Sequence, residues 1–249
     1  MRLVRLLAII LFLTPQPGMA QQDKGKPTFS VVTEIFEPMA NPDFTGFEEL
    51  LAKEVYKRIG IAIALSHVPS ERVLRNANEG IDDAILSRVG GMDTLYPNLV
   101  QFREKVMDRE YVAFTTRDDI TISGWHSLKP YDVAFINGWK IFGRNVGDAK
   151  SVTRVRTPEQ LFLLLKPGRA DVVLISRWAG LQQIKDLGLT NGRMVEPPLA
   201  TRGYYFYTNK KHAALVPRAS AALKAMKEDG TYQRIFEQTL GHLEPKRGR

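Results

Sequence analysis

The stretch Gly80-Ile-Asp-Asp83-Ala-Ile-Leu-Ser87-Arg88 returns 88 residues later as Gly168-Arg-Ala-Asp171-Val-Val-Leu-Ile-Ser176-Arg177. Each copy follows a helix-like run that opens at a proline, Pro69 or Pro158. A glycine that can end a helix, an aspartate, a short apolar strand and a Ser-Arg pair then follow in the same order. The repeat therefore predicts two similar α/β halves, each with a polar pair at the carboxyl end of a buried strand.

This placement of the Ser-Arg pairs indicates where a ligand would bind. In open α/β sheets, ligands bind in the crevice beyond the carboxyl ends of the strands. Two similar halves that each deliver a polar pair to such a place predict one cleft between two lobes.

Runs typical of strands and helices alternate around both copies of the repeat. Before the first copy we expect a strand, an amphipathic helix and a second strand at residues 29–34, 46–59 and 61–65. The alternation starts again with two strands and a helix at residues 131–136, 152–155 and 158–165. Short connections between such runs are typical of parallel sheets. The expected fold class is α/β, with a mostly parallel sheet flanked by helices in each lobe.

The last third of the chain is expected to hold a helix at residues 178–187 and one or two final helices within residues 215–240. Pro197-Pro198 is expected to interrupt the extended chain between them, because proline lacks the N–H that a strand ladder needs. Tyr204–Tyr207 has strand character, and we expect it to serve core packing and the hinge.

The repeat also predicts how the chain divides into lobes. We expect lobe one to comprise residues 28–113 and 205–243, and lobe two residues 117–200. Two extended crossings, near residues 113–117 and 201–207, would join the lobes and act as a hinge.

The first twenty residues differ from the rest of the chain. A basic start, Met1–Arg5, precedes the apolar core Leu6–Leu13 and the small-x-small site Gly18-Met19-Ala20. This pattern is typical of a secretory signal peptide and is too short to span a bilayer. We expect cleavage before Gln21 and export to the periplasm.

Composition excludes several classes of protein. The chain has no cysteine, which excludes a disulfide scaffold and any thiolate nucleophile or thiolate metal site. Its formal charge is +8, and removal of Arg2 and Arg5 with the signal peptide leaves +6. The basic residues are scattered rather than gathered in a stripe with aromatic residues, so we expect no nucleic-acid partner.

Cofactor chemistry is not expected either. The four histidines, at positions 67, 126, 212 and 242, are widely separated and have no i, i+4 partner or acidic companion in the sequence. A metal site needs clustered ligands. The chain also has no Gly-x-Ser-x-Gly elbow and no loop that would cradle a phosphate. We therefore expect no metal, no organic cofactor and no enzymatic activity.

Five short motifs occur in a fixed order along the chain: Phe36-Glu37-Pro38, Gly46-Phe47-Glu48, Gly80-x-x-Asp83-Ala84, Gly168-Arg169-Ala170-Asp171 and Met226-Lys-Glu-Asp-Gly-Thr231. In this order and spacing they resemble the bacterial extracellular solute-binding proteins of family 3, over nearly all of the mature chain. The resemblance implies a two-lobe type II periplasmic-binding-protein fold and a small polar ligand. It also implies an ABC transporter permease or a membrane sensor as partner, and we expect a monomer.

Two departures from the family pattern concern the ligand. Amino-acid binders of the family usually carry a Ser/Thr-rich stretch and then an arginine that clamps the α-carboxylate, and the stretch Arg88–Tyr96 lacks that spacing. They also usually carry a carboxylate for the ligand ammonium five residues after the second aspartate, where this chain has Ser176. The resemblance therefore implies the fold, and an α-amino acid as the ligand does not follow from it.

In lobe one, the candidate ligand-binding residues with polar side chains are Ser87, Arg88 and Arg72. Arg88 ends the first repeated strand, and a guanidinium can bind a carboxylate through two hydrogen bonds. The alternative is a surface arginine paired with Asp93 or Glu104. Arg72 lies in the first turn of a helix, where the helix dipole disfavours a cation. Its alternative is a solvated side chain.

Aromatic residues supply the expected walls of the cleft. Phe36 would give the ligand an apolar surface, with core packing as the alternative. Trp139 begins a helix after a strand, and it is either a cleft wall or an anchor on the lobe surface. Glu34 could accept a ligand N–H, with capping or surface pairing as the alternative. In lobe two, one residue of a group of three is expected to face the cleft: Ser176, Arg177 or Trp178.

The repeated aspartates are interpreted as structural. Asp83 and Asp171 each follow a helix-ending glycine and precede the strand, at the end away from the cleft. Capping of the turn explains both of them without any catalytic role.

These residues predict a protein that captures a small polar ligand, with a carboxylate, between its lobes. Arg88 and Arg177 are expected to face the ligand without carboxylate partners, which would favour an anionic group and repel a purely cationic ligand. The alternative is an exported enzyme on the same fold, either dehydratase-like or a domain associated with lytic transglycosylases. General acid–base catalysis would then depend on Glu34, which has no identifiable partner in the sequence.

Overall fold

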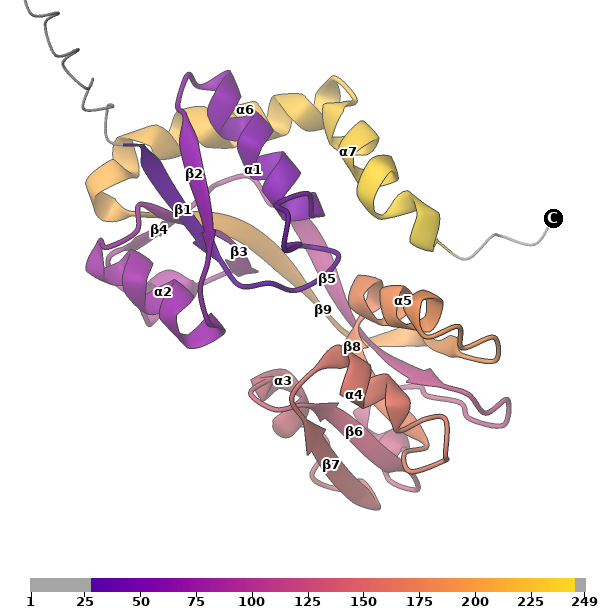
Figure 1. Ribbon diagram of the computed structural model, residues 1–249. Helices are drawn as coiled ribbons and strands as arrows, with labels where there is room; N and C mark the ends of the chain where they lie inside the picture. The colour runs from indigo at the N-terminus through magenta and orange to yellow at the C-terminus, as the bar shows by residue number, and fades with distance from the viewer. Residues whose placement is uncertain (1–27, 245–249) are drawn as a thin grey trace, which may run out of the picture.

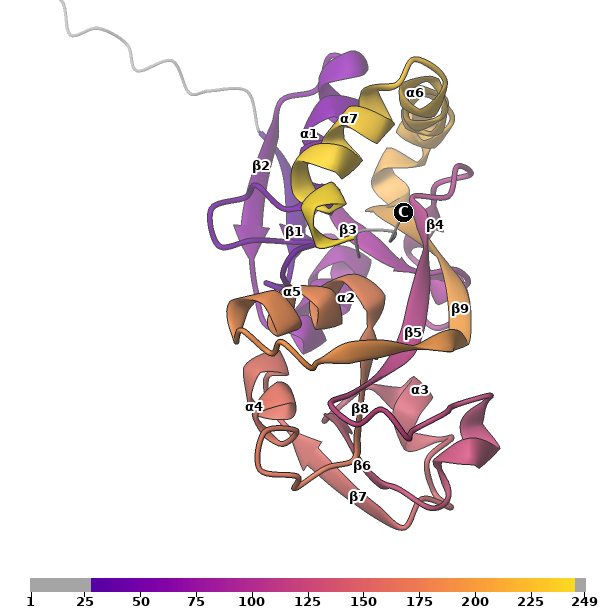
Figure 2. The ribbon, with the colours of Figure 1, turned by 90° about the vertical axis from the view of Figure 1, so that its right-hand side faces the viewer.

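Two lobes, one above the other, are connected by two long strands in the computed structural model, which describes residues 28–244 (Figure 1). The strands are β5 (Met107–Thr115) and β9 (Arg193–Asn209), and both run through the junction between the lobes (Figure 2). The predicted signal peptide, residues 1–20, lies outside the described residues. The two-lobe α/β fold predicted from the repeat is confirmed.

Lobe one contains a parallel sheet in the order β2-β1-β3, with β9 and β4 antiparallel at its far side. Its strands are β1 (Phe29–Thr33), β2 (Ile63–His67), β3 (Ala84–Val89) and β4 (Leu99–Gln101). Three helices cover one face: α1 (Phe47–Arg58), α6 (Val216–Glu228) and α7 (Thr231–Thr239). The helix α2 (Ser70–Glu79) covers the other face. Strand residues alternate between the two faces, so Val31 packs under α1 and Val32 under α2.

Lobe two repeats this arrangement around the parallel strands β7-β6-β8, with β5 antiparallel beside β8. The strands are β6 (Asp132–Ile136), β7 (Ser151–Val155) and β8 (Val172–Ser176). One face is covered by α4 (Pro158–Leu163) and α5 (Arg177–Asp186), and the other by the short α3 (Lys140–Gly143).

The two lobes share their connecting strands, so hydrogen bonding continues from β2 in lobe one to β7 in lobe two. Between the lobes, residues 107–111 of β5 pair with residues 200–204 of β9. Beyond that ladder β5 pairs with β8, and β9 pairs with β3. The parallel strands of each lobe thus flank a central antiparallel pair, which the strand pattern of the sequence did not indicate.

The predicted break at Pro197-Pro198 is found in the pairing of β9 with β5, whereas the chain itself stays extended for 17 residues through both prolines. Its pairing with β5 passes from Tyr111 opposite Ala200 directly to Ala113 opposite Val195. The prolines therefore lie in an irregular part of the ladder that does not need their missing N–H groups.

The repeated aspartates have matching structural roles in the two lobes, as predicted. The carboxylate of Asp83 accepts a hydrogen bond from the backbone N–H of Ser30 at 2.8 Å, and that of Asp171 accepts one from Asp132 at 3.0 Å. The backbone carbonyl of each aspartate accepts a hydrogen bond from a threonine of the neighbouring antiparallel strand: Thr208 in lobe one and Thr115 in lobe two. Each aspartate therefore fixes the start of its strand against both neighbours.

Asp83 has two further partners that the sequence did not indicate. His212 Nε2 and Lys211 Nζ lie 2.7 and 2.8 Å from its Oδ1. Burial alone would raise the pKa of Asp83, but hydrogen bonds from Lys211, Ser30 and His212 lower it to about 2. The carboxylate is therefore charged at neutral pH and stabilises the folded state.

We expect Asp83→Asn to lower the free energy of unfolding by about 2 kcal/mol at pH 7. Because the folded-state pKa is below the unfolded value, this contribution is complete above pH 4 and disappears as the pH falls toward 2. Urea unfolding of the unmodified chain and of Asp83→Asn, at several values between pH 7 and pH 2, measures this contribution to the free energy of unfolding. The control is Asp93→Asn at an exposed position, which should change stability by less than about 0.5 kcal/mol. A difference between Asp83→Asn and the unmodified chain that stays constant down to pH 2 would contradict the assignment.

Candidate functional site

Two aromatic residues predicted to line the cleft come from opposite lobes and meet at their junction. Phe36 follows β1 of lobe one, and Trp139 precedes α3 of lobe two. Their ring centroids are 5.3 Å apart. Trp139 also stacks on Phe142 with an interplanar angle of 3° and contacts the edge of Tyr111 at 5.9 Å. The carboxyl ends of β1 and β6 therefore face each other across an aromatic wall.

Ser87 and Arg88 lie near the carboxyl end of β3, and each has a polar atom without a hydrogen-bond partner among the described residues. Arg88 Nη1 donates to the carbonyl of Ser87 at 3.0 Å. Arg88 Nη2 lies 3.3 Å from Glu34 Oε1, within reach of an ion pair but without the alignment of a hydrogen bond. Among the described residues, neither Ser87 Oγ nor Arg88 Nη2 has a hydrogen-bond partner, although both are buried. Buried polar atoms without partners are rare in folded proteins and are often explained by a ligand, a water molecule or an ion.

The expectation that Arg88 and Arg177 form an unpaired cationic pair is wrong. Arg88 has Glu34 as an ion-pair partner. The Arg177 guanidinium donates to Glu110 on β5 and, at 2.7 Å, to Glu196 on β9. Burial alone would lower the pKa of Arg177, but these carboxylates raise it above its ordinary value. The sequence did not indicate the pairings because each partner lies on a different element.

The other predicted residues are placed as follows. Arg72 is exposed in the first turn of α2. Ser176 is buried, precedes α5 and lies opposite Tyr111 in the ladder between β8 and β5. Trp178 packs against Phe236 of α7, 5.3 Å between ring centroids, and so forms a second contact between the lobes. Of the three lobe-two candidates, Ser176 is therefore the one next to the aromatic wall.

The sequence did not indicate a buried cluster of polar side chains that adjoins the aromatic wall. Arg109 on β5 forms an ion pair of 2.6 Å with Glu48 of α1, and its guanidinium lies 4.0 Å above the ring of Tyr204. The hydroxyl groups of Tyr204 and Tyr111 are 2.6 Å apart. Burial raises the pKa of Tyr111, so the hydroxyl stays protonated and can donate. The cluster connects α1, both connecting strands and, through Tyr111, Trp139.

The expectation that the histidines have no acidic companion is wrong for two of them. His67 Nε2 lies 2.8 Å from Glu49, and His212 Nε2 lies 2.7 Å from Asp83. These pairs lie on separate parts of lobe one. Within residues 28–244, histidines and carboxylates do not gather in any group of three that could hold a metal ion.

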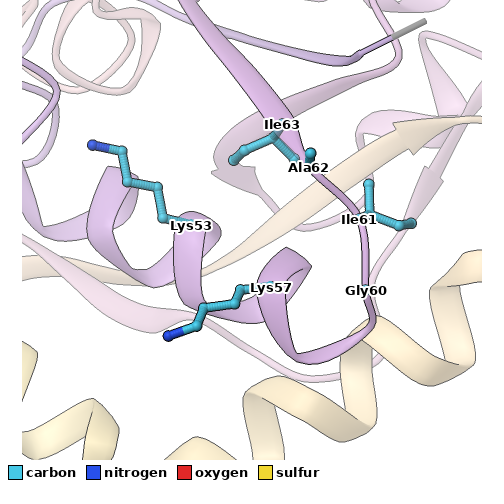
Figure 3. A pocket seen from close by; sticks show the side chains of 6 residues that line it. All are labelled: Lys53, Lys57, Gly60, Ile61, Ala62 and Ile63. Atoms are coloured by element: carbon cyan, nitrogen blue, oxygen red, sulfur yellow. The ribbon is translucent and has the colours of Figure 1, made fainter. Parts of the chain in front are cut away.

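A shallow pocket of about 410 Å³ lies on the outside of lobe one, between α1 and the start of β2 (Figure 3). Its lining is Lys53, Lys57 and the segment Gly60–Ile63, and the two lysine side chains extend from the helix. Lobe two contributes nothing to it, so it is not the cleft predicted from the repeat.

As for membrane spans, no helix in the described range has both the length and the apolar character needed to cross a bilayer.

Comparisons with known proteins agree with this geometry. The profile of the family described as bacterial extracellular solute-binding proteins, family 3, matches residues 31–242. The chain is 25% identical to the L-cystine-binding protein TcyA of Bacillus subtilis (strain 168), over 88% of this chain and 83% of that protein. It is also 25% identical to the ABC transporter arginine-binding protein 1 of Escherichia coli (strain K12), over 80% of this chain and 83% of that protein.

Solved structures with low sequence identity share the fold. A histidine kinase sensor domain with similarity to periplasmic binding proteins superposes with a TM-score of 0.70 at 19% identity. The superposition covers 88% of this chain and 98% of the sensor domain. This fold therefore occurs in sensor domains as well as in transport proteins.

Proposed function

The chain belongs to the bacterial extracellular solute-binding proteins of family 3, and from this premise we propose that it captures a small zwitterionic ligand, such as an amino acid, between its two lobes. The observation that carries the proposal is the contact of Phe36 with Trp139 beside the Glu34–Arg88 pair. Residues of both lobes thus converge on one place, as they must in a protein that closes around its ligand.

The charges at this place fit both ends of a zwitterion. Arg88 Nη2 and Ser87 Oγ would bind the ligand carboxylate, because both are buried and lack hydrogen-bond partners among the described residues. Glu34, whose Oε1 lies 3.3 Å from Arg88 Nη2, would accept hydrogen bonds from an ammonium group. The aromatic wall of Phe36 and Trp139 would cover the aliphatic part. The names of the two curated relatives, a cystine-binding and an arginine-binding protein, support an amino-acid-like ligand.

We further propose that the protein has no catalytic activity. Glu34, the carboxylate on which acid–base catalysis would depend, is paired with Arg88 and not with a group that could relay a proton. The alternative of a dehydratase-like or lytic enzyme therefore gains no support from the site.

The setting that we propose is the periplasm, where the monomeric protein would present its ligand to an ABC transporter or to a membrane sensor. The lobes would pivot about the ladder between residues 108–110 and 201–203, where the two connecting strands form ladder pairs only with each other. On β5 this pivot lies a few residues before the crossing that the repeat predicted near residues 113–117, and on β9 it lies within the one predicted near residues 201–207.

A thermal-shift screen of the mature chain tests the proposed ligand class. At a ligand concentration of 100 Kd, binding to the folded state should raise the melting temperature by roughly 5–10 °C. We expect such shifts from one or a few amino acids and not from polyamines or neutral sugars. The control is Lys57→Ala in the outer pocket of lobe one, which should leave the shift unchanged. A stabilising sugar or polyamine, with no response to any amino acid or organic acid, would disprove the proposal.

A further inference from the structure

A larger cavity, of about 950 Å³, lies on the other side of β5 from the aromatic wall. Tyr111 contacts Trp139, whereas the preceding residue, Glu110, lines this cavity. Successive residues of a strand point to opposite faces, so β5 separates the two places. The cavity is framed by β5, β9, α5 and the segment that follows α7, which lie close together in Figure 2.

The walls of the cavity are largely apolar and come from both lobes. Trp178 of α5 and Phe236 of α7 meet edge to face across it, at 83° between their ring planes. Five aliphatic or thioether side chains complete the apolar part of the wall: Met107, Leu181, Ile184, Met194 and Leu243. A cavity of this size and character falls in the range of small-molecule sites.

The charged residues that line the cavity are four carboxylates (Asp108, Glu110, Glu196 and Glu244) and three cations (Arg177, Lys185 and Arg193), which leaves a net charge of −1. Glu110, Arg177 and Glu196 form a connected group of two carboxylates around one guanidinium, with a net charge of −1. Each carboxylate accepts a hydrogen bond from Arg177 through one oxygen. Its other oxygen has no donor among the described residues and is free to accept one from a ligand. Arg193 also lines the cavity, but its guanidinium donates to backbone carbonyls of residues 117, 118 and 120.

We propose that this cavity is a second binding site, for an organic monocation with an apolar body. The ammonium or amidinium group would donate hydrogen bonds to the free oxygens of Glu110 and Glu196 and restore neutrality. The apolar body would lie against Trp178 and Phe236, where an indole also attracts a cation. Because these walls belong to both lobes, an occupant would favour the lobe arrangement that holds them together, and its binding would be coupled to that of the cleft ligand.

Calorimetric titration of the full mature chain with phenethylamine tests this assignment, with 3-phenylpropionate as an anionic probe of the same size. We expect saturable binding of the amine and none of the acid. Glu196 is half-exposed, so Glu196→Gln should not affect folding, and we expect it to weaken the binding of phenethylamine at least tenfold. Asp93→Asn replaces an exposed carboxylate elsewhere and should leave the affinity for phenethylamine unchanged.

A second variant separates this site from the cleft. Arg88 is not among the residues that line the cavity, so the Arg88→Ala variant should bind phenethylamine as the unmodified chain does, even if it no longer binds the cleft ligand. The assignment is overturned if the acid binds as well as the amine, if Arg88→Ala abolishes amine binding, or if no saturation occurs up to about 1 mM. None of these outcomes depends on the proposed amino-acid ligand, so the two proposals can fail separately.

Discussion

Replacing Glu48 by alanine is expected to lower the free energy of unfolding by about 3–5 kcal/mol, the largest effect of any single change discussed for this protein. The side chains of Glu48 and Arg109 are only 4% and 13% exposed, and their ion pair is 2.6 Å long. Without Glu48 the Arg109 guanidinium would remain buried with no carboxylate partner. Burial lowers the pKa of Arg109, whereas Tyr204 and Glu48 raise it above its ordinary value, so the arginine is charged in the folded state.

Chemical denaturation of Glu48→Ala measures the effect. The matched control is Glu54→Ala, two turns further along α1, where the ion pair with Arg58 is at the surface. That change should cost less than about 1 kcal/mol. The double variant Glu48→Leu with Arg109→Met should regain most of the loss, because an apolar pair avoids the burial of charge. If Glu48→Ala and Glu54→Ala cost the same, the buried pair does not have the role described.

The loss of Arg88 should have the largest effect on ligand binding. We expect Arg88→Ala to weaken the ligand identified by thermal shift by about 2–4 kcal/mol, or roughly 30- to 1000-fold in Kd. The reason is that a carboxylate enclosed between the lobes would lose its charge-assisted partner. Stability should change little, because the remaining Glu34 is one-third exposed and can be solvated.

Calorimetric titration of Arg88→Ala, with Arg75→Ala as control, tests this expectation. Arg75 is an exposed arginine of α2, and its loss should leave the Kd within a factor of two or so. An unchanged affinity in Arg88→Ala would remove the carboxylate anchor from the proposal. An equal loss in both variants would show that only the overall charge of lobe one matters.

Local patterns account for the parts of the fold that were predicted well. Gly80 and Gly168 both adopt left-handed backbone angles, with φ of 76° and 66°: Gly80 ends α2, and Gly168 ends the turn that follows α4. The apolar runs after Asp83 and Asp171 form buried strands, as expected for runs that lie between two layers of helices. Such features depend on residues within one turn or one strand, so they can be read along the chain.

The site was predicted less completely because its contacts join distant parts of the chain. Phe36 and Trp139 were each expected in the cleft, but their contact depends on how the lobes are placed. Arg177 was expected to face a ligand, and the structure pairs it with Glu110 and Glu196, which are 67 and 19 residues away. A charged side chain binds the nearest opposite charge in space, and the sequence does not show that distance.

By itself, the sequence determined that this protein has two similar α/β halves and a family 3 type of fold, because helix stops and apolar strand runs are local and recur in both copies. The partners of its charged residues were decided only by the tertiary structure. Tertiary packing brings Arg109 of β5 to Glu48 of α1, and the pairing of β5 with β9 holds Glu110 and Glu196 where Arg177 can bind both. The cleft and the second cavity are therefore products of strand pairing between the lobes, since neither exists until both connecting strands are in register.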